Sequence, residues 1–302
     1  MSDHRPPTID PAAAARWQQR PQSASAWLHE EVARRMAQRL DWIVRRPQRW
    51  LHWEPVRGGL AAQTELAQRY RGVPCDVLVA QVPERALARQ KILPPWWQPA
   101  RWRGGPRFLT QPQAGGADML WANMALHMEP DPQALIRRWH EALAVDGFLM
   151  FSCFGPDTLR ELRSLYQTMG WPAPAHEFTD MHDWGDMLVG AGFAEPVMDM
   201  ERIELTFETP QRLLQELREL GRNLHPARPA GLRARGWLSA LHAALGRLAD
   251  PAQDGRLRLT FEIVYGHAFK PARRLAVDAE TRFSVEELRA SLIQGKTGRS
   301  PV

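Results

Sequence analysis

The sequence has little cysteine and no long apolar run. Cys75 and Cys153 are the only cysteines among 302 residues, too few for a disulfide framework or a cysteine-based zinc site. We therefore expect two free and mostly buried thiols. No run of about 18 apolar residues occurs, and the first residues lack the apolar core of a signal peptide. These absences exclude a disulfide-rich mini-protein and predict a cytoplasmic protein that does not enter a membrane.

Lysine is also scarce, with only Lys91, Lys270 and Lys296. The net charge of +5 and the pI near 9.7 therefore come almost wholly from arginine. A guanidinium binds carboxylates and phosphates, so this balance favours an acidic small-molecule substrate or an acidic carrier protein. The alternative is ordinary solvated surface charge. The chain lacks a block of about five basic residues, which argues against a nucleic-acid partner and leaves nucleic-acid methylation resting on the pI alone.

Hydrophobic residues make up 44% of the chain and charged residues 24%, which is enough for a folded core. Short apolar runs typical of buried strands alternate with helical patterns along the first half. The expected strands are 50–53, 75–82, 107–110, 118–123 and 147–154, and the expected helices are 25–43, 60–70, 84–90 and 132–144. This alternation predicts an α/β fold with a mostly parallel, doubly wound sheet.

The C-terminal half changes pattern. Residues 203–208 and 257–265 alternate between apolar and polar, which predicts an antiparallel pair at the sheet edge. Two helical patterns lie between them, at 211–220 and 237–248, so we expect 209–256 to be a helical lid insertion. We divide the chain into a flexible N-terminal arm (1–22) with at most a short helix at 12–19, a main domain (23–270) and a C-terminal tail (271–302).

Several segments of this α/β pattern resemble class I S-adenosylmethionine-dependent methyltransferases, which have a Rossmann-like sheet. The stretch 117–127, followed by Pro130 and Asp131, is similar to the fourth-strand motif of that superfamily. Segments 136–144 and 146–152 resemble the helix and the fifth strand that follow. The resemblance implies S-adenosylmethionine as the methyl donor.

A narrower resemblance is to the biotin-synthesis methyltransferases, which make the methyl ester of malonyl-[acyl-carrier protein]. It spans about residues 16–270. The segments that carry it are 27–36, 154–162, 178–186, 191–193, 195–199 and 261–268. It implies O-methylation of a malonyl thioester carboxylate on an acyl-carrier protein.

The first cofactor landmark departs from the family pattern. After strand one the family has an acidic residue followed by Gly-x-Gly-x-Gly, because only glycine lets the backbone approach the cofactor closely. Residues 51–59 read LHWEPVRGG, so Gly58 and Gly59 remain. Glu54 and Val56 stand where side chains would crowd the ligand.

Two further landmarks lack their carboxylate. Gln81 ends strand two, where the family's acidic residue accepts both ribose hydroxyls, and an uncharged amide makes weaker hydrogen bonds. Gln111 stands at the third landmark, near the adenine. Glu84 is an alternative to Gln81 if the turn is shifted. The cofactor-binding set implied by the resemblance is Trp53, Gly58, Gly59, Gln81, Asn123 and Leu126. The competing hypothesis is a pseudo-methyltransferase that has lost cofactor binding and acts as a binding or scaffold protein.

Three arginines lie on segments that we expect to face the pocket or its lid. Arg160, Arg163 and Arg222 are candidates to bind the malonyl carboxylate through a bidentate contact, and solvated helix arginines are the alternative. We assign no catalytic residue, because a carboxylate is already a nucleophile and needs no base. His127 is therefore expected to be a pocket wall.

No metal site is expected. Asp180, Asp183 and Asp186 are spaced three residues apart, but the first two suit the N-terminal end of a helix.

Overall fold

The computed structural model describes residues 9–94, 96, 97, 105–229, 231, 235–250 and 254–272. Of the expected tail, residues 273–302 lie outside this range, as do residues 1–8 of the expected arm. No helix in the described part is long and apolar enough to cross a membrane.

Within the described residues, eight strands form one mixed sheet in the order β3-β2-β1-β4-β5-β8-β6, with β7 paired to β8. The strands are β1 (Trp50–Trp53), β2 (Cys75–Leu78), β3 (Arg107–Leu109), β4 (Ala117–Ala122), β5 (Leu143–Phe154), β6 (Ala194–Phe207), β7 (Ala249–Asp250) and β8 (Arg256–Phe269). β3, β2, β1, β4 and β5 are parallel, whereas β8 runs antiparallel to both β5 and β6. The predicted mostly parallel sheet with an antiparallel edge pair is confirmed. Its order reverses between β1 and β4, the place where open α/β sheets bind ligands.

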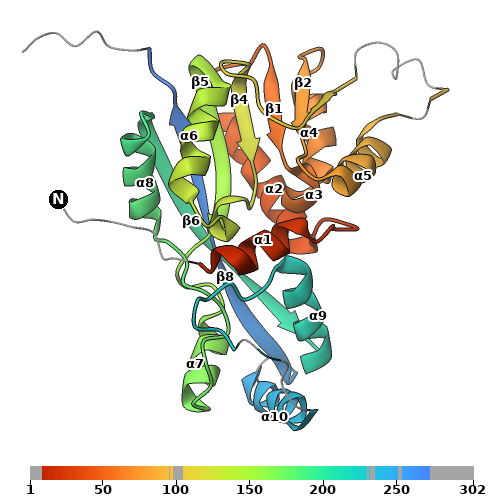
Figure 1. Cartoon of the computed structure of the whole chain (residues 1–302), viewed down its shortest axis with the longest axis vertical. Coiled ribbons are helices and arrows are strands. Elements are labelled where there is room, and N and C mark those ends of the chain that lie inside the picture. Colours follow the sequence, from red (N-terminus) through yellow and green to blue (C-terminus); the bar gives the residue numbers. More distant parts are fainter. Residues whose placement is uncertain are drawn as a thin grey trace, which may run out of the picture. The chain divides into compact units, whose positions relative to one another are not determined.

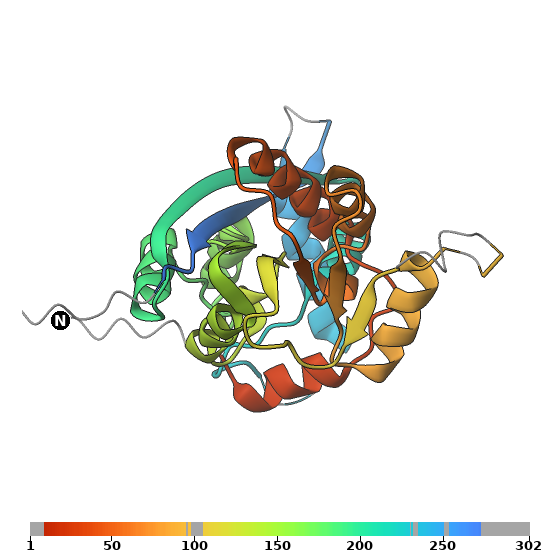
Figure 2. The ribbon, with the colours of Figure 1, turned by 90° about the horizontal axis from the view of Figure 1, so that it is seen from above.

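Helices cover both faces of this sheet (Figures 1 and 2). They are α1 (Pro11–Gln19), α2 (Trp27–Arg39), α3 (Pro55–Gly58), α4 (Ala61–Arg69), α5 (Val82–Ile92), α6 (Pro132–Ala142), α7 (Arg160–Thr168), α8 (Met181–Gly190), α9 (Pro210–Leu220) and α10 (Arg235–Leu245), with 3-10 turns η1 (Leu40–Trp42), η3 (Leu126–Met128) and η4 (Gly246–Leu248). The buried side chains form one large cluster with α2 and α4 and another with α6 and α8. Buried strands between two helical layers explain the near-continuous apolar runs of the parallel strands.

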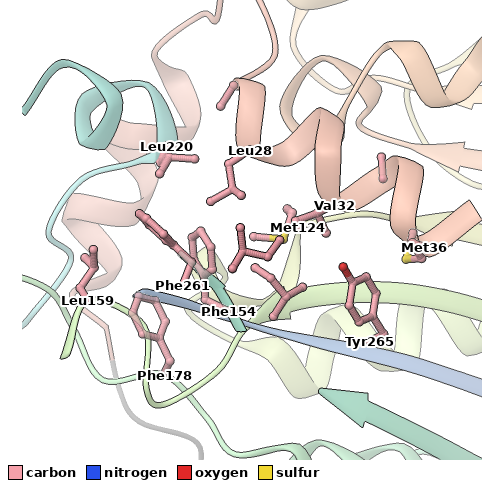
Figure 3. Packing of buried hydrophobic residues seen from close by; sticks show 14 of the residues in the cluster. Leu28, Val32, Met36, Met124, Phe154, Leu159, Phe178, Leu220, Phe261 and Tyr265 are labelled. Carbon is pink, nitrogen blue, oxygen red and sulfur yellow. The ribbon is translucent and has the colours of Figure 1, made fainter. Parts of the chain in front are cut away.

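The face covered by α2 is fully buried. Leu28, Val32 and Met36 recur at intervals of four residues, and none of them is exposed. Figure 3 shows these three side chains pointing toward Met124 and Tyr265 in the same apolar cluster. Burial of each such side chain contributes about 2 kcal/mol. The spacing in the sequence therefore fixes which side of α2 meets the sheet.

The first turn of α2 differs from the prediction. The helix begins at Trp27, with Ala26 as an N-cap that gives no side-chain hydrogen bond. Ser25 accepts a hydrogen bond from the Leu60 N–H at 3.1 Å instead of capping α2. The Glu30 carboxylate accepts from the same N–H at 2.8 Å, so both side chains fix the start of α4 on α2.

The edge strands β6 and β8 are longer than the alternating segments predicted. Each has 14 residues, and together they extend beyond the parallel strands toward α7, α9 and α10 (Figure 1). α9, α10, η4 and β7 all lie between β6 and β8 in the chain, within the segment expected to be a lid insertion. α10 contacts both α7 and α9.

The N-terminal segment differs from a loose arm. Asp10 caps α1 by accepting from the N–H groups of Ala12 and Ala13 at 2.8 and 3.1 Å. Its other carboxylate oxygen pairs with Arg228. Ala14 and Trp17 are buried with Leu224 in a small apolar cluster. Residues 9–22 thus pack across the carboxyl ends of the strands (Figure 2).

Three tryptophans lie in the expected loop just before β3, and the sequence suggests that they anchor this loop by packing on the core. The structure does not bear this out for two of them. Trp96 and Trp97 are about two-thirds exposed. The third, Trp102, lies outside the described residues.

Candidate active site

A cavity of about 210 Å³ opens at the carboxyl ends of β1, β2 and β4. Trp53 and Leu78 come from the strand ends, Ala80 and Gln81 from the loop after β2, and Asn123 from the loop after β4. The other lining residues are Trp17, Gln18, Gln22, His29, Glu54, Arg57, Met124, Ala125, Met128, Leu135, Arg138, Glu219 and Leu220. Small-molecule sites commonly reach about 300 Å³ or more. This cavity is smaller because α1 and the residues after it cover it.

Glu54 occupies the corner between β1 and β2. Its N–H donates to the Leu78 carbonyl at 2.9 Å and extends the β1–β2 ladder by one residue. Its φ of 46° then turns the chain into α3, in the left-handed region that non-glycine residues seldom adopt. One carboxylate oxygen, Oε1, accepts from the Ala80 N–H at 2.9 Å, while Oε2 is buried without a hydrogen-bond partner.

Burial raises the pKa of Glu54 to about 7, and the nearby Glu84 carboxylate adds to the rise. The Ala80 N–H and the guanidinium groups of Arg57 and Arg138 act in the opposite direction. A carboxyl group without enough donors to stabilise its charge holds its proton more tightly.

Glu84 does not reach the cavity. Its side chain is fully buried and accepts from Arg57 at 2.7 Å and from the Gln22 N–H at 3.1 Å. Arg57 also donates to the carbonyls of Gln18 and Arg20 at 2.8 and 3.0 Å. The alternative that Glu84 substitutes for Gln81 is therefore wrong, because Glu84 fastens the segment after α1.

Of the cofactor-binding set implied by the sequence, Trp53, Gln81 and Asn123 line the cavity. Asn123 is held firmly, because its carboxamide donates to the carbonyls of His29 and Gly58 and accepts from the Ser152 hydroxyl at 2.6 Å.

The other three members of that set lie outside the cavity lining. A Cβ on Gly58 would meet the Asn123 carbonyl oxygen at 2.5 Å, so this glycine allows close packing rather than ligand contact. Gly59, at φ 123°, faces Ala33 of α2. Leu126 is 1% exposed and packs in the α6-side core, because η3 turns its side chain inward.

A second cavity, of about 410 Å³, lies between the sheet and the helices α7, α9 and α10. Its walls are mostly apolar. Figure 3 shows five of them together, namely Phe154, Leu159, Phe178, Leu220 and Phe261. Met128 and Leu220 line both cavities, so the two spaces adjoin across an apolar boundary.

Two histidines stand at this boundary. His29 lines the first cavity and His127 the second, and their ring centroids are 6.3 Å apart in an edge-on arrangement. The carbonyl of Arg57 accepts from His29 Nδ1 at 2.7 Å, and His176 donates to the carbonyl of His127 at 2.8 Å. Burial lowers the pKa of His29 to about 4, and that of His127 well below its usual value. His29 Nε2 and His127 Nδ1 are buried without partners. The boundary thus carries neutral rings with unused hydrogen-bonding atoms.

The three predicted substrate arginines differ in position. Arg222 lines the second cavity, as does Arg218 one helical turn earlier. Sequence reasoning missed Arg218, although its four-residue spacing from Arg222 was visible. Arg163 is outside the lining, where it donates to the Pro156 carbonyl at 2.6 Å. Arg160 is exposed and paired with Glu161 at 3.2 Å.

The acidic residues at 180–186 serve local structure. Asp180 caps α8 by accepting from the His182 N–H at 2.8 Å, as predicted. Among the described residues, no group of three or more histidine, cysteine or acidic side chains is arranged to hold a metal ion.

Known proteins similar in sequence indicate the family of this chain. No family model matches the chain. The chain is 39% identical to malonyl-[acyl-carrier protein] O-methyltransferase of Gallionella capsiferriformans over 268 residues, covering 84% of this chain and 88% of the relative. It is 36% identical to the enzyme of that name from Laribacter hongkongensis, covering 83% and 85%.

Among solved structures, a putative methyltransferase from Bacillus halodurans aligns with a TM-score of 0.51 at 12% identity, over 78% of this chain and 99% of that one. This alignment agrees with the mixed α/β fold of the described residues. The chain belongs to the malonyl-[acyl-carrier protein] O-methyltransferase family.

Proposed function

We propose that this protein transfers a methyl group from S-adenosylmethionine to the free carboxylate of a malonyl thioester carried on acyl-carrier protein, a step of biotin synthesis. The observation that carries the proposal is the pair of cavities sharing Met128 and Leu220. One cavity lies at the reversal of the sheet order, where a nucleoside ligand binds in this fold class. The other is apolar and opens toward the lid segment, so it suits an acyl chain.

The residues of the first cavity fit an S-adenosyl ligand. Trp53 and Leu135 supply apolar walls, the Gln81 carboxamide can accept and donate, and Glu54 offers an unpartnered carboxylate oxygen. The cavity measures about 210 Å³, and Trp17 and Gln18 of α1 and Gln22 after it form the part of its wall that could move to admit the ligand. A cationic ligand suits this cavity, because a positive charge beside Glu54 lowers the pKa of its carboxyl group and favours the ionised form.

S-adenosylmethionine supplies an electrophilic methyl group on a sulfonium, and a carboxylate oxygen forms the new C–O bond as the C–S bond breaks. The residues of this chain align the acceptor and exclude water. Met128 and Leu220 form a dry boundary, where an unsolvated carboxylate is a stronger nucleophile. Holding two reactants in line replaces a bimolecular encounter and removes several kcal/mol, up to about 10, from the barrier.

The second cavity offers polar groups for the acceptor at two places. Arg218 and Arg222 line it on the α9 side, and His127 lies at the boundary with the donor cavity. His127 Nδ1 can donate to an acceptor oxygen while the ring stays neutral. The arginine-rich composition suits an acidic carrier protein, because opposite charge raises the rate of encounter. We further propose that the protein acts in the cytoplasm, where its free thiols Cys75 and Cys153 stay reduced.

The competing hypothesis is a scaffold protein that has lost the cofactor. The identity of 36–39% to two enzymes named malonyl-[acyl-carrier protein] O-methyltransferase favours the methyltransferase.

Calorimetric titration with S-adenosylmethionine and S-adenosylhomocysteine tests the choice. Micromolar affinity, about 8 kcal/mol, together with methyl transfer to malonyl-loaded carrier protein, is the expected result. Absence of heat and of thermal stabilisation at about millimolar ligand would overturn the methyltransferase proposal.

A further inference from the structure

The Glu54 side chain joins the end of β1 to the loop after β2. It follows Trp53 at the end of β1, yet its carboxylate is fixed to the Ala80 N–H, one residue before Gln81. The side chain therefore crosses from one strand to the next and places a carboxylate where the sequence of the second strand supplies only an amide. Glu54 also lines the donor cavity.

We infer that Glu54 is the carboxylate that accepts the ribose hydroxyls of the S-adenosyl ligand, a role that the end of β2 cannot fill with Gln81. The inference rests on the proposed function. In dinucleotide-binding α/β folds, a carboxylate near the end of the second strand accepts hydrogen bonds from ribose hydroxyls. Here the carboxylate reaches that place from the first strand.

The first argument concerns the hydrogen bonds that the Glu54 carboxylate accepts. Oε1 has one donor, the Ala80 N–H at 2.9 Å, and Oε2 has none although it is buried. Buried polar atoms are normally satisfied, and an exception needs an explanation. A ribose diol has two O–H donors, which would satisfy Oε2 and the remaining lone pair of Oε1. The raised pKa of the ligand-free carboxyl group is consistent with missing donors.

The second argument is the backbone. Glu54 has φ 46° and ψ 57°, a left-handed conformation that is unfavourable for a non-glycine residue. Glycine would adopt it freely at that corner. The chain thus carries a carboxylate, at the edge of the donor cavity, at a turn position that glycine would fill more easily.

The third argument removes the nearest competitor. The Glu84 carboxylate already accepts hydrogen bonds from Arg57 and from the Gln22 N–H, and it lies outside the cavity lining. Glu219 also lines the cavity, but it comes from α9 and, among the described residues, has no hydrogen bond to the loop after β2. The ligand ammonium group is the other chemical partner that a carboxylate could take. The attachment to Ala80 favours the ribose, and the experiment separates the two.

The test is a calorimetric cycle that crosses variants with ligands. The proteins are the natural chain, Glu54→Gln, Glu54→Gly and the control Glu65→Gln, which removes an exposed acidic side chain on α4. The ligands are S-adenosylhomocysteine and its analogue lacking both ribose hydroxyls. Thermal unfolding of each variant checks the fold, and Glu54→Gly is expected to be at least as stable as the natural chain because it relieves the positive φ.

We expect Glu54→Gln and Glu54→Gly to weaken S-adenosylhomocysteine binding about 10- to 100-fold, the size of a charge-assisted hydrogen bond, and Glu65→Gln to leave it unchanged. The analogue that lacks both ribose hydroxyls should bind all four proteins equally weakly. Removing the Glu54 carboxylate and removing the hydroxyls delete the same contact, so the second change costs nothing further. Losses that add independently would show that Glu54 meets another part of the ligand, such as the ammonium, and would overturn the inference. Equal affinity of Glu54→Gln and the natural chain would overturn it as well. If the natural chain itself binds neither ligand, the proposed function fails instead.

Discussion

The carbonyl oxygen of Asn123 lies 2.5 Å from the place that a Cβ atom on Gly58 would occupy. The end of β4 and the end of α3 therefore touch through backbone, and the Asn123 carboxamide closes the contact by donating to the Gly58 carbonyl. Gly58 holds together two walls of the donor cavity without lining it.

Gly58→Ala should lower the free energy of unfolding by about 1–3 kcal/mol, because the methyl group has no room and the β4 end must shift. Urea denaturation measures the loss. Gly190→Ala is the matched control, since a Cβ there meets no atom within 4 Å. Equal stability of the two variants would show that the contact is not tight.

Arg222→Ala should reduce kcat/KM for the malonyl-loaded carrier protein about 10- to 100-fold, because it removes a guanidinium from the acceptor cavity. Arg160→Ala is the control and should change little, since that side chain is exposed and paired with Glu161. Steady-state kinetics with varied carrier protein checks both. A larger loss for Arg160→Ala would relocate the acceptor site.

The stability of the protein should fall steeply in mild acid. His29, His52 and His176 have pKa values lowered to about 4 by burial, and that of His127 lies well below 6.5. The unfolded chain binds protons near pH 6.5 and the folded chain does not. The stabilisation that comes from keeping these histidines neutral is therefore complete above about pH 6.5 and is lost as the pH falls toward 4. Each histidine adds a slope of up to about 1.4 kcal/mol per pH unit.

Urea midpoints measured between about pH 7 and about pH 5 give this slope. A midpoint that stays constant across the range would contradict the burial of the neutral rings.

Ligand binding should also depend on pH, through the raised pKa of the Glu54 carboxyl group. The pKa of Glu54 is raised to about 7 in the free protein, and the ionised form is the better hydrogen-bond acceptor. The affinity for S-adenosylhomocysteine should therefore rise as the pH rises through about 7, and fall by up to about tenfold per unit below it. Calorimetry in buffers of different ionisation enthalpy would also detect proton release on binding. Glu54→Gln should bind with no such pH dependence.

Opening of α1 should limit how fast the ligand enters. Asp10 caps α1 and pairs with Arg228, so this carboxylate joins α1 to the chain beyond α9. Asp10→Ala should raise the association rate several-fold, and Arg228→Gln, which removes the ion pair but leaves the Asp10 cap on α1, should raise it less. Stopped-flow fluorescence can follow entry, since Trp17 and Trp53 line the cavity. Unchanged rates in both variants would show that α1 is not the barrier.

The sequence predicted β1 and β4 well, because each is a short run that is almost fully buried on both faces. It placed the start of β6 nine residues late, at 203 rather than Ala194. Charged residues interrupt that region, and Asp199 and Glu201 make their ion pairs with Arg39 and Arg35 of α2. Partners that distant along the chain leave no local pattern.

The candidate site was predicted in part for the same reason. Trp53, Gln81 and Asn123 follow strand ends, so the topology alone brought them to the cavity. Leu126 also follows β4, but the 3-10 turn rotates it into the core. Glu54 was predicted to be an obstacle, because the path of its side chain to Ala80 depends on a positive φ that the sequence does not reveal.

Among the strands of the described residues, the antiparallel strand β8 is the last to leave the ribosome, yet it lies between β5 and β6. Until Phe269 has emerged, both neighbours expose unpaired edges, and β6 has no partner in the sheet. Unpaired edges are templates for association between chains. The nascent protein therefore has an open sheet until β8 has emerged, and a chain cut short before β8 should require chaperones or aggregate rather than form a smaller version of the fold.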